Sequence, residues 1–202
     1  MQTPGNQIPT SHVWYACYGS NLSSQRISCY IQGGKPLESN RNYQGCTDKT
    51  PPLKDRQYVI YHELYFAKSS PIWDNGGVAF LKPEKDPEYT TLGRMYLITE
   101  EQFIQVLRQE NGQDPDDTSM TIDLKRTIQK GAITIGNGWY SHVMFLGFKD
   151  EVPIFTFTSP DILTPNPPGP HYLQTIRSGI HECYPSLTDS DIDEYFRRCG
   201  VD

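Results

Sequence analysis

Long hydrophobic runs and an apolar leader segment are both missing from this sequence of 202 residues. Its longest apolar stretches fall far short of the roughly 20 residues that a membrane helix needs. Residues 1–12 are polar and carry two prolines, which does not fit a secretory signal. We therefore expect a soluble, cytoplasmic protein that does not enter a membrane.

Positive charge is also scarce. Lys and Arg number 18 against 24 Asp and Glu, which gives a formal net charge of −6. No basic run is present that would follow a phosphate backbone, so nucleic acid is not an expected partner.

The cysteines and histidines lack the spacing of metal or redox motifs. The five cysteines are far apart and form no CxxC pair, and the histidines show no ligand-like spacing. We expect reduced thiols in a reducing compartment, with no metal and no cofactor. These residues are Cys17, Cys29, Cys46, Cys183 and Cys199, and His12, His62, His142, His171 and His181.

The length and the aromatic content indicate one globular domain with a ring-lined pocket. A chain of 202 residues can bury a core without disulfides or metals as cross-links, so we expect residues 1–202 to form one domain. Residues 1–12 would be a polar N-terminal extension, and residues 32–56, rich in Gly, Pro and Asn, would be a long surface loop. The 13 tyrosines need hydrogen-bond partners for their hydroxyls, which suits a wet pocket.

The order of apolar runs and turn residues predicts an α+β fold. Ring-rich or alternating runs predict strands, and capped segments with helical spacing predict helices. We expect a small mixed β-barrel, partly closed and flanked by helices. The predicted strands are residues 13–18, 58–67, 76–81, 91–98, 141–148 and 153–158, and the predicted helices follow Asn21 and Thr99 and cover residues 171–182 and 188–198.

Two places in this pattern suggest chemistry. Gly19-Ser20-Asn21 breaks the first strand just before a predicted helix, where free backbone N–H groups and the helix dipole favour an anionic ligand group. Glu110 lies near the C-terminal end of the helix that begins after Thr99. There the dipole disfavours negative charge, so we expect a raised carboxyl pKa if the side chain is also partly buried.

Five segments resemble those of γ-glutamylcyclotransferase and its relatives, in the same order. They are the YGSNL signature at Tyr18–Leu22, a Ser, Trp and Gly-Gly-x-Ala segment at Phe66–Phe80, a Gly-x-x-Tyr strand at Leu92–Tyr96, a helix end at Leu107–Glu110, and a helix with Tyr172, Ile176, Gly179 and Glu182. Together they span roughly residues 13–185. The sequence departs from the family at residues 33–56 and 160–170, which resemble insertions.

The resemblance implies an enzyme of transferase or lyase type that needs no cofactor. It would cyclise a small-molecule γ-glutamyl amide to 5-oxoproline and release the amine, because the α-amine can attack its own γ-carbonyl without a nucleophilic side chain. Glu110 would be the general base. The substrate would be held by residues of the signature and of the last helices, namely Tyr18, Gly19, Ser20, Asn21, Leu22 and Tyr172.

Other interpretations of the same residues stay open. Glu110 taken alone fits a solvated carboxylate at a helix end, Tyr172 a core ring, and Arg26 a surface charge beside the helix. Gly19-Ser20-Asn21 alone fits a simple turn, and Trp73 with Gly76-Gly77 fits packing better than ligand contact. The fold also suits a binding or interaction module without turnover, since a fold does not guarantee chemistry.

A cysteine amidase is a third alternative, with Cys17 as nucleophile and His62 as base. Strand alternation would point Cys17 away from the face of Tyr18, so a buried structural thiol is the favoured interpretation. The sequence does not distinguish a monomer from a homodimer, although an exposed edge of a curled sheet can pair two subunits.

Overall fold

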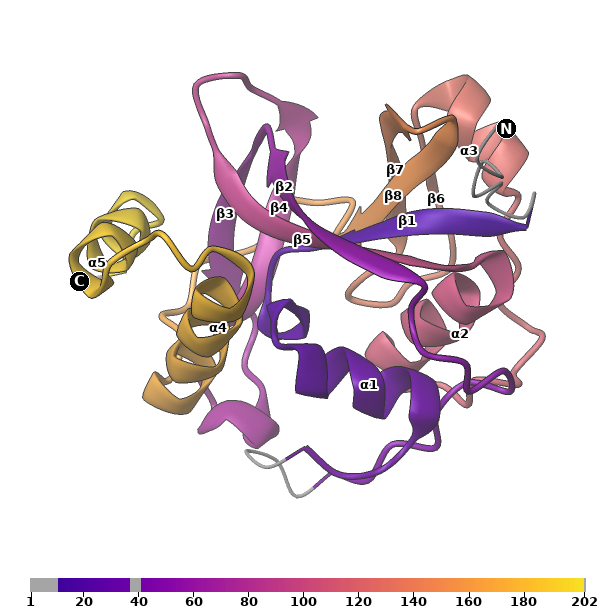
Figure 1. Cartoon of the computed structure of the whole chain (residues 1–202), viewed down its shortest axis with the longest axis horizontal. Helices are drawn as coiled ribbons and strands as arrows, with labels where there is room; N and C mark the ends of the chain where they lie inside the picture. The colour runs from indigo at the N-terminus through magenta and orange to yellow at the C-terminus, as the bar shows by residue number, and fades with distance from the viewer. Residues whose placement is uncertain (1–10, 37–40, 202) are drawn as a thin grey trace, which may run out of the picture.

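The computed structural model describes residues 11–36 and 41–201, and Figure 1 shows the arrangement of their helices and strands. The strands are β1 (His12–Cys17), β2 (Lys54–Ile60), β3 (His62–Ala67), β4 (Val78–Lys85), β5 (Thr91–Thr99), β6 (Ala132–Thr134), β7 (His142–Lys149) and β8 (Val152–Thr158). The helices are α1 (Ser24–Gln32), α2 (Glu100–Glu110), α3 (Leu124–Lys130), α4 (Pro170–Cys183) and α5 (Asp189–Arg198). Two short 3₁₀ helices cover Ser20–Leu22 and Pro71–Trp73.

The main sheet is mixed, with six strands in the order β2-β5-β1-β8-β7-β6. β1 pairs antiparallel with β5 and parallel with β8, so the strand that precedes Tyr18 lies in the middle of the sheet. Its sequence, HVWYAC, is buried over its last five residues, as a central strand requires. The loop that follows β1 therefore leaves from a fixed, buried position.

A two-stranded sheet, β3-β4, lies against the main sheet and is joined to it by side chains. The Thr158 hydroxyl accepts from the Leu81 N–H at 2.9 Å and donates to the Leu81 carbonyl at 2.8 Å. The Thr91 hydroxyl donates to the His62 carbonyl at 2.7 Å. These side-chain bonds replace a continuous backbone ladder, which leaves the structure only partly closed.

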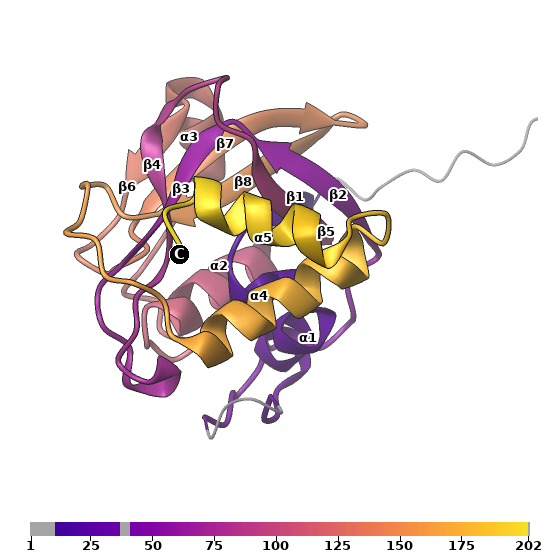
Figure 2. The same cartoon turned by 90° about the vertical axis from the view of Figure 1, so that its left-hand side faces the viewer.

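The helices cover the sheet in two groups (Figures 1 and 2). α1 and α2 lie side by side below the main sheet, where α2 contacts β1 and β5. α4 packs on the 3₁₀ helix Ser20–Leu22, and α5 follows at the same end of the molecule. α2 starts with a complete capping box, in which Thr99 and Gln102 each bond the other's backbone N–H.

Close backbone approach explains two of the glycines. A Cβ on Gly179 of α4 would lie 2.5 Å from the Leu22 carbonyl carbon and 2.5 Å from the Ser23 nitrogen. A Cβ on Gly77 would lie 2.0 Å from the Asn166 carbonyl oxygen. Gly179 thus allows α4 to rest on the YGSNL loop, and Gly77 allows the proline-rich connector to run against the start of β4.

The structure differs from the sequence expectations in several places. The predicted strand 58–67 is two strands, because the chain leaves the main sheet at Tyr61 and begins a second sheet at His62. The apolar residues continue across this break, so their pattern does not reveal it. α3 and β6 were not predicted at all.

The predicted extension and loop are also altered at their boundaries. Residues 1–10 of the extension and 37–40 of the loop lie outside the described residues, and β1 already begins at His12. The loop is shorter than 32–56, because α1 includes Gln32 and β2 starts at Lys54. Across the described part of the chain, no helix combines the length and the apolar character needed to span a membrane.

Candidate active site

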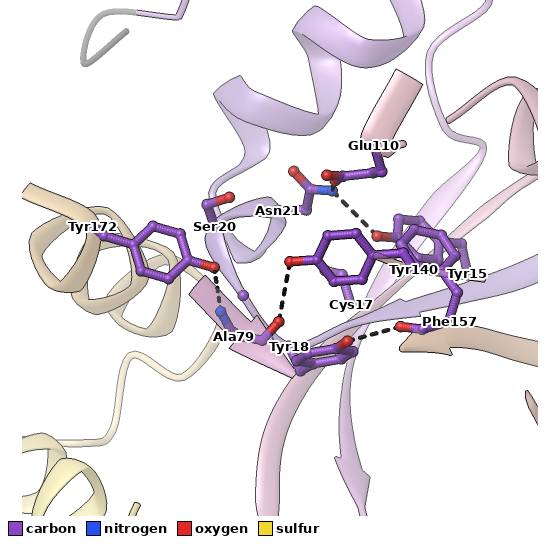
Figure 3. A pocket seen from close by; sticks show the side chains of 11 residues that line it. Tyr15, Cys17, Tyr18, Ser20, Asn21, Ala79, Glu110, Tyr140, Phe157 and Tyr172 are labelled. Carbon is purple, nitrogen blue, oxygen red and sulfur yellow. Dashed lines mark hydrogen bonds between the residues drawn. The ribbon is translucent and has the colours of Figure 1, made fainter. Parts of the chain in front are cut away.

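A small cavity, partly open to solvent, lies between the YGSNL loop, the end of α2 and the start of α4 (Figure 3). Four of its eleven lining residues are tyrosines, and Glu110 is its acidic side chain. The cavity is lined by Tyr15, Cys17, Tyr18, Gly19, Ser20, Asn21, Ala79, Glu110, Tyr140, Phe157 and Tyr172. The structure thus brings together every predicted site residue except Leu22.

Glu110 is the last residue of α2, and its carboxylate is half-buried against the cavity. Asn21 donates a 2.7 Å hydrogen bond from Nδ2 to Glu110 Oε1. Burial raises the pKa of the Glu110 carboxyl, and the charge of Arg26 and the hydrogen bonds from Asn21 and Tyr30 only partly offset this effect. The expected direction of the pKa shift is confirmed, and burial is its main cause.

Asn21 links the signature loop to Glu110. Its Nδ2 also lies 3.2 Å from the Tyr15 hydroxyl, to which it donates a second hydrogen bond. Its Oδ1 is buried and has no hydrogen-bond partner among the described residues. A buried acceptor without a donor is costly, so this oxygen marks a place where a ligand N–H can bind.

Tyr172 projects from the first turn of α4 with its hydroxyl in the cavity (Figure 3). The hydroxyl oxygen accepts from the Ala79 N–H at 3.1 Å and also from the Ser20 N–H. Burial raises its pKa to about 12, so it stays protonated at neutral pH. Since both known bonds use the oxygen as acceptor, the hydroxyl hydrogen is left to donate to a ligand.

Gly19 makes room for this hydroxyl. A Cβ at that position would lie 2.9 Å from the Tyr172 oxygen and 3.3 Å from the Ala79 Cβ. The glycine of the signature therefore serves close packing at the cavity wall, rather than a left-handed backbone conformation, since its φ is −112°.

Two of the other tyrosine hydroxyls in the cavity lining use their hydrogens within the protein. Tyr18 donates to the Phe157 carbonyl at 2.7 Å, and Tyr140 donates to the Ala79 carbonyl at 3.1 Å. Both rings therefore shape the cavity without a free donor. The sequence analysis missed Tyr140, which follows a loop without a recognisable pattern, and Tyr15, which alternation with Cys17 on β1 could have revealed.

The N-terminus of α1 does not offer the anion site expected from the sequence. The Ser24 N–H donates to the Glu182 carboxylate at 3.0 Å, so the protein supplies its own anion there. Arg94 holds this carboxylate at 2.9 Å and also pairs with Asp55 at 2.6 Å. Leu22 is fully buried outside the cavity lining, where its carbonyl accepts from Arg94 at 3.0 Å.

Cys17 lines the cavity, which corrects the expectation that it faces away from Tyr18. Tyr18 follows the last residue of β1, so strand alternation does not apply to it. The Cys17 thiol is buried and donates to the Arg94 carbonyl, and burial raises its pKa well above the ordinary thiol value. His62 does not line the cavity, and its Nδ1 lies 2.9 Å from the Lys82 carbonyl.

A second, outer chamber adjoins the first cavity. The two chambers share Ser20, Glu110, Tyr140 and Tyr172. The outer chamber is further lined by Arg26, Tyr30, Arg41, Tyr43, Ser70, Ile72, Trp73, Val78 and Trp139.

Arg26 is not the surface charge that its sequence context suggested. It is only 2% exposed, and its guanidinium lies over the Trp73 ring at 4.9 Å. Arg26 and Tyr30 are four residues apart on α1, a spacing that places both side chains on one helix face and could have indicated their joint burial.

No group of three or more His, Cys, Asp and Glu side chains that could hold a metal ion occurs in residues 11–36 and 41–201. The cavity offers a half-buried carboxylate, an amide oxygen without a hydrogen-bond partner among the described residues, and a tyrosine donor.

Comparison with protein families and curated sequences gives limited information. No family model matches the chain. A curated relative, histone deacetylase 5 of Arabidopsis thaliana, is 40% identical over 152 residues. This match covers 72% of the chain but only 23% of the relative, so the chain spans about a quarter of that protein's length.

Solved structures are similar over nearly the whole chain. A γ-glutamyl cyclotransferase aligns over 95% of this chain and 88% of its own with a TM-score of 0.54 at 15% identity. An uncharacterized protein from Homo sapiens aligns over 95% and 89% with a TM-score of 0.53 at 15% identity. YkqA from Bacillus subtilis aligns over 95% and 55% with a TM-score of 0.50 at 15% identity. The chain therefore has the fold of γ-glutamyl cyclotransferase.

Proposed function

We propose that this protein is a γ-glutamylcyclotransferase-like enzyme. It would convert a γ-glutamyl amide into 5-oxoproline and release the amine. The observation that carries the proposal is the pair of half-buried Glu110 and buried Asn21, in which a carboxylate of raised pKa accepts a 2.7 Å hydrogen bond from the amide of the YGSNL loop. The fold shared with a γ-glutamyl cyclotransferase supports the same conclusion.

The pair suits the α-ammonium group of a glutamyl substrate. An ammonium group has three N–H donors, and this wall of the cavity offers two acceptors, the Glu110 carboxylate and the unpaired Asn21 Oδ1. Glu110 would accept one of the protons and leave a neutral amine. Its raised pKa makes it a stronger base than a solvated glutamate, which is the direction that general base catalysis requires.

The neutral α-amine then attacks the γ-carbonyl carbon within the same molecule. A C–N bond forms, and the carbonyl oxygen takes the electron pair of the former π bond. The Tyr172 hydroxyl hydrogen is a donor in the cavity that can stabilise this oxyanion. Collapse of the intermediate re-forms the carbonyl and breaks the original amide C–N bond, and the leaving nitrogen takes the proton held by Glu110. The ring nitrogen then gives its extra proton back to the Glu110 carboxylate, which passes it to the released amine, so that the products are the lactam and an ammonium ion.

The reaction balances without water, metal or cofactor, because one amide becomes a lactam and an amine. Holding the glutamyl chain bent would supply most of the rate enhancement, since well-oriented intramolecular attack is worth about 7–11 kcal/mol. Proton transfer through Glu110 adds roughly 10²–10⁴-fold.

The test is an incubation of the purified protein with a panel of γ-glutamyl amides, with 5-oxoproline measured by mass spectrometry. We expect Glu110→Gln to lose about 10²–10⁴-fold in kcat, because the amide keeps the shape and cannot act as base. Glu101→Gln is the control, since Glu101 is an exposed carboxylate on the same helix. Full activity of Glu110→Gln on a substrate that the parent turns over would disprove the mechanism.

A small-molecule-binding module without turnover is the second candidate. It is favoured by the sequence relative, in which the matching region is only 23% of a larger protein and would be one part among others. This function predicts that 5-oxoproline or glutamate raises the melting temperature while no γ-glutamyl compound is consumed. A cysteine amidase has less support, because the Cys17 thiol is bonded, has a raised pKa and lacks a histidine in the cavity lining.

A further inference from the structure

Asn111, the residue that follows Glu110, holds part of the cavity wall through its side chain. Tyr140 lies in the loop of residues 135–141 between β6 and β7, outside the paired residues of both strands. The Tyr140 N–H donates to Asn111 Oδ1 at 3.0 Å, and Asn111 Nδ2 donates to the Tyr140 carbonyl at 3.2 Å. One amide side chain thus binds both backbone groups of Tyr140 and fixes this loop to the end of α2.

The end of the helix does not itself require an asparagine at this position. Asparagine often follows a helix because it tolerates a left-handed backbone, but Asn111 has φ −87° and ψ 10°. The left-handed residue after α2 is Gly112, with φ 73°. Asn111 Nδ2 also donates to the Leu107 carbonyl at 3.0 Å, which holds the side chain on the last turn of α2. The amide is therefore used for its hydrogen bonds and not for its backbone conformation.

Gly138 makes room for this amide. A Cβ at position 138 would lie 2.1 Å from Asn111 Oδ1 and 2.6 Å from its Cγ. Gly138 does not have a left-handed φ, so the turn itself does not demand a glycine there. The glycine and the asparagine therefore form one unit, in which the absent side chain of the first admits the amide of the second.

Tyr140 connects Asn111 to the proposed oxyanion donor. Its ring lines both chambers, and its hydroxyl donates to the Ala79 carbonyl at 3.1 Å. The Ala79 N–H donates in turn to the Tyr172 hydroxyl at 3.1 Å, and Figure 3 shows both bonds. Because residue 111 is covalently bonded to the proposed base, these contacts join the base to the donor.

We propose that Asn111 is a positioning residue, which sets the distance between the Glu110 carboxylate and the Tyr172 hydroxyl. In the proposed reaction both groups act on one bent substrate, and a misplacement of about 1 Å costs about 10²-fold in rate. Replacing Asn111 removes neither group, so the substrate still binds while the reacting atoms lose their alignment. The inference rests on the proposed function and adds to it a residue outside the lining of both chambers.

The first test compares kcat with KM on a γ-glutamyl amide that the parent turns over. We expect Asn111→Ala to lower kcat about 10- to 100-fold and to leave KM nearly unchanged. Asp123→Ala is the matched control, because the Asp123 side chain accepts from the Arg126 N–H and caps α3 in the same segment between α2 and β7. Loss of this cap costs about 1 kcal/mol of stability and should not change kcat. A parent-like kcat in Asn111→Ala, or an equal loss in Asp123→Ala, would overturn the proposal.

Gly138 allows a second test that removes no side chain. Gly138→Ala should lower kcat about as much as Asn111→Ala, because the new Cβ displaces the amide. In a protein that already carries Asn111→Ala, the same replacement should cost little more, since the atoms at 2.1 and 2.6 Å are gone. Losses that multiply in the double variant would show that the two positions act independently, which contradicts the proposal.

Hydrogen exchange separates this inference from the proposed function, because it needs no turnover. Asn111→Ala should speed amide exchange in a peptide that contains Ala79, whereas Asp123→Ala should not. If turnover depends on Glu110 but Asn111→Ala changes neither kcat nor this exchange, the inference fails and the proposed function stands. If no γ-glutamyl amide is consumed but the exchange at Ala79 responds to Asn111→Ala, the proposed reaction fails while the control of the cavity wall by Asn111 stands.

Discussion

The contact between α4 and the YGSNL loop leads to a prediction with an unusual sign. Gly179 lies inside α4, where replacement by alanine would normally stabilise the helix by about 1 kcal/mol. Here the new Cβ would lie 2.5 Å from backbone atoms of Leu22 and Ser23, against 3.4 Å for ordinary contact. Backbone atoms cannot rotate away, so α4 and the loop must separate by about 0.9 Å, the difference between those distances.

The net effect of Gly179→Ala follows from these two opposing contributions. Overpacking costs about 1–3 kcal/mol. We expect a cost at the upper end of this range, because both atoms that the new Cβ would meet belong to the backbone. Subtracting the gain in helix propensity leaves a loss of about 2 kcal/mol. For a chain of this size that corresponds to a fall of about 4–8 °C in melting temperature.

Thermal unfolding by circular dichroism, with Ser178→Ala as the control, tests the reasoning. Ser178 is exposed and adjacent on the same helix, so its replacement changes helix propensity without a new contact. We expect it to leave the melting temperature nearly unchanged. A higher melting temperature for Gly179→Ala than for the parent would show that α4 does not pack on the YGSNL loop as closely as in the structure.

Two further predictions concern side chains of the cavity. Because burial raises the pKa of the Glu110 carboxyl, the contribution of this group to stability is fully present below the ordinary pKa of 4.5 and is lost as pH rises through the folded-state pKa. The melting temperature of Glu110→Gln should therefore lie above that of the parent at pH 7.5, and the difference should close near pH 4. A difference in melting temperature that does not change with pH would contradict this. Tyr172→Phe and Tyr18→Phe each remove one buried hydroxyl and should each destabilise by about 1–3 kcal/mol in denaturant unfolding. Only Tyr172→Phe should also lower turnover in the 5-oxoproline assay, since the Tyr18 hydrogen is already bonded to Phe157, and equal losses of turnover would refute the assignment of the donor.

Much of the fold could be predicted because its local signals agree with its tertiary structure. The α+β fold class and the resemblance to γ-glutamyl cyclotransferase are confirmed by the structure and by its comparison with solved structures. The capping box at Thr99 begins α2 where the sequence placed a helix. The split of the predicted strand at Tyr61 was not predictable, because apolar residues on both sides of the break are buried in different sheets.

The site residues that lie in recognisable sequence segments were predicted, whereas those that only tertiary packing brings to the site were missed. Tyr18, Asn21, Glu110 and Tyr172 meet in one cavity, although their roles stay proposals. The spacing of Arg26 and Tyr30 on α1 could have indicated that Arg26 is buried, but the contact of Arg26 with Trp73 joins residues about fifty positions apart, and no local pattern reports it.

The contact of α4 with the loop also sets the order in which the cavity can be completed. A chain is synthesised from its N-terminus, so the signature loop and Glu110 are made well before Tyr172 and Glu182. Until α4 exists, the Ala79 N–H lacks its acceptor and the first turn of α1 lacks its carboxylate cap. A nascent chain that ends before α4 therefore has the carboxylate but no finished wall, and it becomes competent for its ligand only once α4 has been made.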